Sequence, residues 1–310
     1  MHHPFDTNIE SLHRIPLLFI VAIIYILRCM AKVHLIGVDN LSPNSIAGQF
    51  PDPAEAIAHA RSMFEEYGVT WVDLGAQATN PWAKLIPVEQ EWERFEAVVP
   101  ALLAAYPGRI SIDSFRPEIH ERIARLRLGP HIWNDITNLN DPDSRERAIH
   151  LYKSGAVSKF IISHLAQEFG RDFKRAHAQG RIDNPKLVLK ESLHQHTQLL
   201  LGGVKARDII TGPGIGFGKT MRTNWQLVGF GKMLPPQMPV EIGFSHKRML
   251  TTREDGQPLS KDKDYNEAQK TNAARHHDVA EMAIKAAGNR DVYLRVHEPE
   301  WYQDLITQPE

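Results

Sequence analysis

The sequence predicts a single (β/α)8 barrel of the TIM type, an α/β fold, and three observations support this prediction. From residue 32 onward, the chain repeats a short apolar strand, a polar loop and an amphipathic helix. Eight strand-like runs can be counted, as a closed barrel of this type requires. The composition shows no linker-like shift, which argues against a doubly wound protein with two domains.

The elements follow from apolar patterns along the chain. Strands are expected where short apolar runs end in polar loops, at residues 33–38, 71–74, 109–112, 131–134, 159–163, 208–211, 240–244 and 291–296. Helices are expected where apolar residues recur every three or four positions, at residues 53–67, 89–105, 117–128, 144–154, 185–201, 223–233 and 266–287. The chain has 310 residues and is 42% hydrophobic, so it can bury a full core.

Residues 1–29 are expected to be an N-terminal extension, and residues 30–305 to form the barrel domain. Residues 17–27 are an unbroken apolar run, about half of the ~20 residues that span a bilayer. A secretory signal is disfavoured, because the preceding stretch is not clearly positive and Arg28-Cys29-Met30 is a poor cleavage site. A peripheral membrane anchor stays open, but no membrane partner is expected.

Charge and cysteine content narrow the class of protein. Lys and Arg number 36 against 37 Asp and Glu, a formal net charge of -1, and there is no basic stripe for nucleic acid. Cys29 is the single cysteine, so an intrachain disulfide and a cysteine-based zinc site are excluded. This composition fits a reducing compartment and predicts a cytoplasmic protein without a nucleic-acid partner.

A glycine-rich loop at residues 212–220 follows the sixth predicted strand. It is not a Walker phosphate loop, because Pro213 occupies a position that needs glycine, and it is not a dinucleotide fingerprint, because its third glycine comes one position early. Phe217 and Lys219 are expected to supply a flat apolar face and a fixed charge beside it. The loop suits a flat, polar or anionic small molecule, although a turn without a ligand is the alternative.

Polar residues follow nearly every predicted strand, at the end of the barrel where active sites lie. Asp113 or Asn134 alone could simply cap a helix, but a barrel without a ligand would not need polar groups at so many strand ends. The candidates are Asp39, Asn40, Asp73, Thr79, Asp113, Ser114, Asn134, Asp135, His164, Ser245, His246, Lys247, Arg295 and His297, with the glycine-rich loop.

Seven motifs at these strand ends resemble, in order, those of the dihydropteroate synthase family of pterin-binding barrels. The resemblance extends from about residue 32 to residue 301. The motifs are Asn-Leu-Ser-Pro-Asn-Ser-Ile at 40–46, Asp-Leu-Gly-Ala-Gln-Ala-Thr-Asn-Pro-Trp-Ala at 73–83, Ile-Asp-Ser at 112–114, Asn-Asp-Ile at 134–136, Pro-Gly-Ile-Gly-Phe-Gly-Lys-Thr at 213–220, Ser-His-Lys at 245–247 and Arg-Val-His at 295–297.

This resemblance implies condensation of 6-hydroxymethyl-7,8-dihydropterin diphosphate with para-aminobenzoate, which releases diphosphate in folate biosynthesis. It implies Mg²⁺ near Asn40 as cofactor, and it leaves a homodimer open. The implied roles are catalysis by Lys247, Arg295 and His297; pterin binding by Asp113, Asn134, Lys247 and Phe217; diphosphate binding by Asn40, Arg295 and His297; and para-aminobenzoate binding by Thr79, Phe217 and Ser245.

The chain also departs from the family pattern. Gly212 stands where the family has an aspartate that pairs with the pterin, and we hypothesise that Glu241 supplies this charge from the seventh strand. Glu241 shares the parity of Gly243, so it should face the barrel interior; a strand shifted by one residue would turn it outward. Other departures are Gln77 for an acid, Asn80 for arginine, Trp82 for glycine and His246 for arginine.

These departures leave other functions open. One alternative is a non-catalytic pterin-binding paralogue. Another is a related pterin enzyme with a different second substrate, or a folate-dependent methyl carrier of the same superfamily. Arg295 and His297 argue for a diphosphate ligand and therefore against the methyl carrier.

Overall fold

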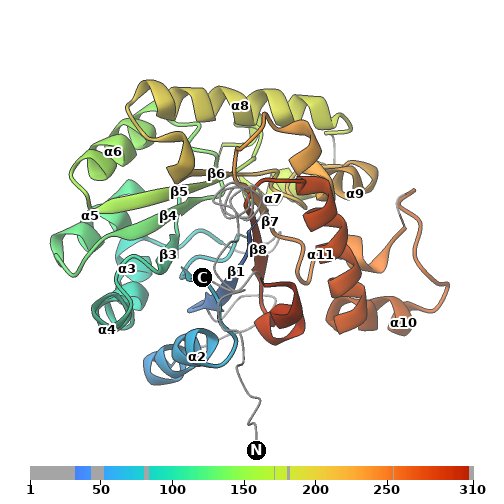
Figure 1. Ribbon diagram of the computed structural model, residues 1–310, viewed down its shortest axis with the longest axis horizontal. Helices are drawn as coiled ribbons and strands as arrows, with labels where there is room; N and C mark the ends of the chain where they lie inside the picture. The colour runs from blue at the N-terminus through green and yellow to red at the C-terminus, as the bar shows by residue number, and fades with distance from the viewer. Residues whose placement is uncertain are drawn as a thin grey trace, which may run out of the picture.

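The computed structural model describes residues 32–42, 52–79, 84–170, 172–179, 182–253 and 255–306 (Figure 1). The predicted extension at residues 1–29, with its apolar run at 17–27, lies outside these ranges. So do Asn80, Trp82 and most of the first motif. In the part of the chain that the structure describes, no helix has both the length and the apolar character needed to cross a membrane.

Eight parallel strands form a closed barrel in chain order, as the sequence predicts. The barrel closes where β1 pairs with β8 in a register that joins Val33 to Val292. The strands are β1 (Val33–Asn40), β2 (Trp71–Gly75), β3 (Ile110–Asp113), β4 (His131–Asp135), β5 (Val157–Ser163), β6 (Ile209–Gly212), β7 (Val240–Ile242) and β8 (Val292–Val296).

The helices lie around the outside of the strands (Figure 1). Several begin at a capping side chain followed by proline, as at Asp52, Asp141 and Asn184, because proline fits the first helical turn. The α-helices are α2 (Pro53–Glu65), α3 (Val88–Glu96), α4 (Val99–Ala105), α5 (Pro117–Arg125), α6 (Pro142–Lys153), α7 (Phe173–Gln179), α8 (Pro185–Leu201), α9 (Met221–Val228), α10 (Lys263–Ala268) and α11 (Ala273–Ala287).

Three predicted helices are broken in the structure. The segment 89–105 divides into α3 and α4 at Val98, which leaves helical geometry just before Pro100. Within the predicted segment 223–233, α9 ends before Gly229, and the chain continues as a 3₁₀ helix at Phe230–Met233. The segment 266–287 is divided because Asn272 caps a new helix, α11, by accepting a hydrogen bond from the Arg275 backbone.

One layer of large side chains fills the centre of the barrel. It consists of one residue from each of six strands, namely Ile36, Trp71, Ile132, Ile161, Ile210 and Tyr293. Side chains alternate along a strand, so the residues two positions further on also point inward. Those residues lie at the carboxyl ends of the strands, which we call the barrel mouth. The interior layer is therefore the floor of the mouth.

Candidate active site at the barrel mouth

Arg295 is the centre of a hydrogen-bonded network that joins four strands. Its Nε donates to Oδ2 of Asp73 at 2.6 Å, and its Nη2 donates to Oδ2 of Asp113 at 2.7 Å. Asp73 also accepts from Asn134 Nδ2 at 3.0 Å and from Ser111 Oγ at 2.5 Å. Both oxygens of Asp73 are thus committed within the protein. The network fixes Arg295, Asp113 and Asn134 at the mouth.

Burial and charge oppose each other in this network. Burial raises the pKa of Asp113 to about 7, although the Arg295 guanidinium opposes the shift. Burial alone would lower the pKa of Arg295, but Asp73, Asp113 and Glu241 raise it above its ordinary value. Arg295 is therefore a permanent cation, whereas Asp113 changes its charge near neutral pH.

Lys247 and Phe217 form a second part of the site. The Lys247 ammonium lies 5.4 Å from the centroid of the Phe217 ring and donates to the Ile215 carbonyl at 2.7 Å. Burial lowers the pKa of Lys247 to about 8, and the Glu241 carboxylate opposes this shift. The pair presents a flat apolar face beside a cation, which suits a flat heteroaromatic ligand.

Lys219 does not face this site, contrary to the sequence-based expectation. Its buried ammonium donates to the carbonyls of His164, Gly214 and Phe217 at 3.0, 2.8 and 2.9 Å. The loop can fold around it because Gly214 has a φ of +58° and passes close to β5, where a Cβ atom would lie 2.1 Å from the His164 carbonyl oxygen. The cation beside Phe217 is Lys247 instead.

Glu241 faces the interior of the barrel rather than the surrounding helices. A Cβ atom built at Gly212 would lie 2.2 Å from Oε2 of Glu241, and one at Gly243 would lie 2.7 Å from Oε1. The side chain is 4% exposed. Its carboxylate therefore stands among the ends of β6 and β7, at the level of Arg295 and Lys247.

Two histidines follow β7 and β8. His297 Nδ1 lies 3.0 Å from Ser245 Oγ, and burial lowers the pKa of His297 well below its ordinary value, with Arg295 adding to this effect. At neutral pH, His297 is a neutral hydrogen-bonding group and not a second cation. His246 Nε2 lies 2.5 Å from Oε1 of Glu298, and its ring packs edge-on against the His297 ring, with the two centroids 5.0 Å apart.

Asn40 and Asp113 converge over a glycine. A Cβ atom at Gly75 would lie 3.3 Å from Asn40 Oδ1 and 3.8 Å from Asp113 Oδ2. Because Gly75 has no side chain, there is space beside the Asn40 and Asp113 oxygen atoms. Thr79 lies further along the loop after β2, directly before residues that the structure does not describe.

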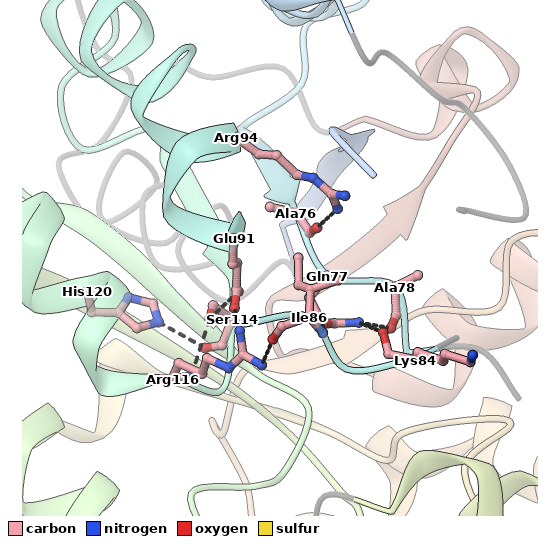
Figure 2. A network of polar contacts seen from close by, with 10 residues as sticks. All are labelled: Ala76, Gln77, Ala78, Lys84, Ile86, Glu91, Arg94, Ser114, Arg116 and His120. Carbon is pink, nitrogen blue, oxygen red and sulfur yellow. Dashed lines mark hydrogen bonds and ion pairs between the residues drawn. The ribbon is translucent and has the colours of Figure 1, made fainter. Parts of the chain in front are cut away.

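Gln77 closes the base of this β2 loop (Figure 2). Its Oε1 accepts from the Ile86 backbone at 2.8 Å, and its Nε2 donates to the carbonyls of Ala78 and Lys84 at 2.6 and 3.3 Å. A carboxylate could accept the first bond but could not donate the other two. The glutamine that replaces the family acid thus has a structural use in this chain.

Glu91 ties the β2 loop to the β3 loop, and it was not among the residues predicted from the sequence. Its buried carboxylate accepts from Arg116 Nη1 at 2.5 Å and from Ser114 Oγ at 2.7 Å, while Arg116 Nη2 donates to the Ile86 carbonyl at 2.5 Å (Figure 2). Glu91 lies on α3, away from any strand end. The signal that could have found it is a charged residue on the apolar face of a predicted helix.

Comparison with known proteins identifies the family of the chain. The family of pterin binding enzymes matches residues 36–297. A probable bifunctional folylpolyglutamate synthase/dihydropteroate synthase of Haloferax volcanii is 30% identical over 224 residues, which are 70% of this chain and 25% of that protein. A folate synthesis bifunctional protein of Chlamydia muridarum is 32% identical over 291 residues, 86% of this chain and 56% of that protein. The chain thus spans only part of these longer relatives.

Solved structures share the fold of this chain, which covers nearly their whole length. The dihydropteroate synthase of Thermus thermophilus in complex with 4-aminobenzoate is 28% identical, with a TM-score of 0.66 and coverage of 88% of this chain and 92% of that chain. The Yersinia pestis dihydropteroate synthase with a sulfonamide drug shares the fold, with a TM-score of 0.71, 22% identity and coverage of 88% and 91%. The chain therefore belongs to the family of pterin binding enzymes.

Proposed function

We propose that the chain is a dihydropteroate synthase, a transferase that joins 6-hydroxymethyl-7,8-dihydropterin diphosphate to para-aminobenzoate and releases diphosphate. The observation that carries the proposal is the Arg295 network, which places a permanent cation beside Asp113 and Asn134 at the barrel mouth. A ligand with both a polar heterocycle and an anionic group fits this combination. Family membership and the fold support the same reading.

In this proposal, the pterin ring lies between the strand ends and the glycine-rich loop. Asp113 and Asn134 offer an acceptor and an amide to the polar edge of the ring, while Lys247 and Phe217 border its flat face. Holding the ring rigidly matters because the reacting methylene carbon must be aligned with the attacking amine. None of these side chains has to form a covalent bond.

The reaction requires stabilisation of a leaving anion. The amine nitrogen of para-aminobenzoate attacks the methylene carbon, the carbon–oxygen bond to diphosphate breaks, and the amine loses a proton. Arg295, whose Nε and Nη2 already donate to Asp73 and Asp113, would neutralise the departing charge with its positive charge, and His297 would donate a hydrogen bond as a neutral group. Thr79, Phe217 and Ser245 are proposed to border para-aminobenzoate.

Mg²⁺ fits the donor set near Asn40. The Asn40 amide oxygen is a hard oxygen ligand and lies over Gly75, where a Cβ atom would be 3.3 Å from it. Among the described residues, no group of three or more His, Cys, Asp and Glu side chains could hold a metal. Asn40 would therefore share the ion with the substrate diphosphate, whose negative charge the ion reduces when bound. A cytoplasmic location is also part of the proposal and rests on the single cysteine.

The pH dependence of kcat/KM should be bell-shaped and narrow. Activity should rise through about pH 7 as Asp113 ionises, because burial raises its pKa. It should fall above about pH 8 as Lys247 loses its proton, because burial lowers that pKa. Steady-state rates between pH 5.5 and 9.5 test this, and a profile that is flat from roughly pH 6 to 9 would contradict both roles.

The proposed function is tested by measuring diphosphate release from the dihydropterin substrate with and without para-aminobenzoate. Release that requires para-aminobenzoate, with dihydropteroate as the second product, supports the proposal. Tight pterin binding without release would identify a non-catalytic pterin-binding protein instead. Release that requires another arylamine would identify a related enzyme with a different second substrate.

A further inference from the structure

Glu241 is a buried carboxylate at the barrel mouth with most of its hydrogen-bonding capacity unused. Among the described residues, its hydrogen-bond partner is Ser163, whose Oγ donates at a distance of 3.4 Å. Asp73 and Asp113, by contrast, each have a guanidinium nitrogen within 2.7 Å. A buried carboxylate is costly unless donors satisfy it. Glu241 therefore has two oxygens available for a ligand.

The backbone around Glu241 is shaped to leave its carboxylate room. The pairing of Thr211 with Val240 places Gly212 beside Glu241 on the same face of the sheet. A Cβ atom at Gly212 would lie 2.2 Å from Glu241 Oε2 and 2.8 Å from Ser163 Oγ. A side chain at position 212 and the observed carboxylate thus exclude each other. Gly212 is the residue that allows Glu241 to stand there.

The charges near Glu241 favour its ionised form, which accepts hydrogen bonds from N–H donors of a ligand. Burial raises the pKa of Glu241, whereas Lys247 and Arg295 oppose this shift and favour the ionised form. The Lys247 ammonium already donates a hydrogen bond to the Ile215 carbonyl, and the Arg295 guanidinium donates to Asp73 and Asp113. The two cations support the charge of Glu241 without using its hydrogen-bonding positions.

We propose that Glu241 recognises the 2-amino group and the adjacent ring N–H of the pterin, from β7. This inference rests on the proposed function and names the specificity-determining residue for its heterocycle. Two neighbouring N–H donors match the two oxygens of a carboxylate, as in other bidentate pairs. A carboxylate attached at position 212 would point into the same space, because Gly212 lies beside Glu241 on the same face of the sheet.

The test compares two ligands in calorimetry: the dihydropterin diphosphate and its 2-oxo analogue, in which an acceptor replaces the 2-amino donor. Wild type should prefer the amino ligand by about ten- to a hundredfold, because one charge-assisted hydrogen bond is lost with the analogue. In Glu241→Gln, the amide offers one acceptor and one donor, which matches the 2-oxo edge. The preference should therefore be lost or reversed.

Two further variants test the link between the strands. Gly212→Ala should displace the Glu241 carboxylate and weaken binding of the amino ligand by a similar factor, since the obstructing atom is the end of a flexible chain. Gly212→Asp combined with Glu241→Val should restore the preference for the amino ligand. Glu121→Gln is the matched control, because Glu121 lies on α5 and pairs with Arg147 on α6 at 2.8 Å, away from the strand ends.

The outcomes separate this inference from the proposed function. If Glu241→Gln keeps the wild-type preference, the inference is overturned while the function stands. If wild type binds neither ligand, the proposed function fails and the inference fails with it. The ratio of two affinities does not depend on how much of a variant is folded, so a partly unfolded variant still gives a result.

Discussion

Replacing Arg295 by methionine is expected to lower kcat/KM for dihydropteroate formation by about a hundred- to ten-thousandfold. The change removes the permanent cation that would receive the departing diphosphate. It also leaves Asp73 and Asp113 without their common partner, and removing one member of a buried ion pair costs roughly 3 to 5 kcal/mol. Steady-state kinetics and denaturant unfolding, both at about pH 8, would measure the two effects.

Arg295→Lys separates charge from geometry in this prediction. Lysine keeps the charge but cannot donate in two directions from a planar fork, so its activity should lie between those of wild type and the methionine variant. Arg290→Lys is the matched control, because Arg290 precedes β8 and donates to the carbonyls of Pro235 and Ala287 at 2.7 and 2.9 Å. Wild-type activity in Arg295→Lys would show that activity does not need the two hydrogen bonds from Arg295 to Asp73 and Asp113.

The barrel could be predicted because its strands carry a simple pattern. Short apolar runs end in polar residues, and each is followed by a segment with helical periodicity. The apolar spacing alone did not predict the breaks within helices, since the spacing of residues 89–105 continues through the bend at Val98. The residues that mark two of the breaks in the sequence are Pro100 and the capping Asn272. Helix α7 was missed because it is short and follows a 3₁₀ turn.

The residues at the barrel mouth could be predicted from the sequence, but their hydrogen-bond partners could not. The ends of parallel strands meet at one end of a closed barrel, which brings Asn134, Lys247 and Arg295 together. Which groups pair depends on the shear and closure of the barrel: Asp73 bonds Arg295, which follows it by 222 positions. Asp73 was predicted only as a polar residue at a strand end, without a role in the site.

Lys219 shows why a motif does not fix the direction of a side chain. A lysine in a glycine-rich loop suggests an anion site, but three glycines with positive φ fold the loop back over the ammonium. Burial lowers the pKa of Lys219 well below its ordinary value, and Lys247 adds to this shift. The three carbonyls bound by Lys219 belong to β5's end and to the loop that carries Phe217. Lys219 is therefore a positioning residue for the site.

A lysine whose folded pKa is depressed also makes stability depend on pH. The unfolded chain binds more protons than the folded protein between the depressed pKa and about 10.4, so this contribution to stability rises with pH across that window. Lys219→Met lacks the contribution. Its stability, compared with that of wild type, should therefore fall progressively behind as the pH rises toward about 10.4.

Lys219→Met is expected to raise KM for the dihydropterin diphosphate by about tenfold or more, with a smaller change in kcat. Three buried carbonyls lose their shared donor, at a cost of about 1 to 3 kcal/mol for each that stays unsatisfied, and the loop relaxes away from Lys247. Lys232→Met is the control, because Lys232 is exposed on the 3₁₀ helix Phe230–Met233. Steady-state kinetics would measure both constants. An unchanged KM in Lys219→Met would contradict a positioning role and would show that Lys219 serves folding alone.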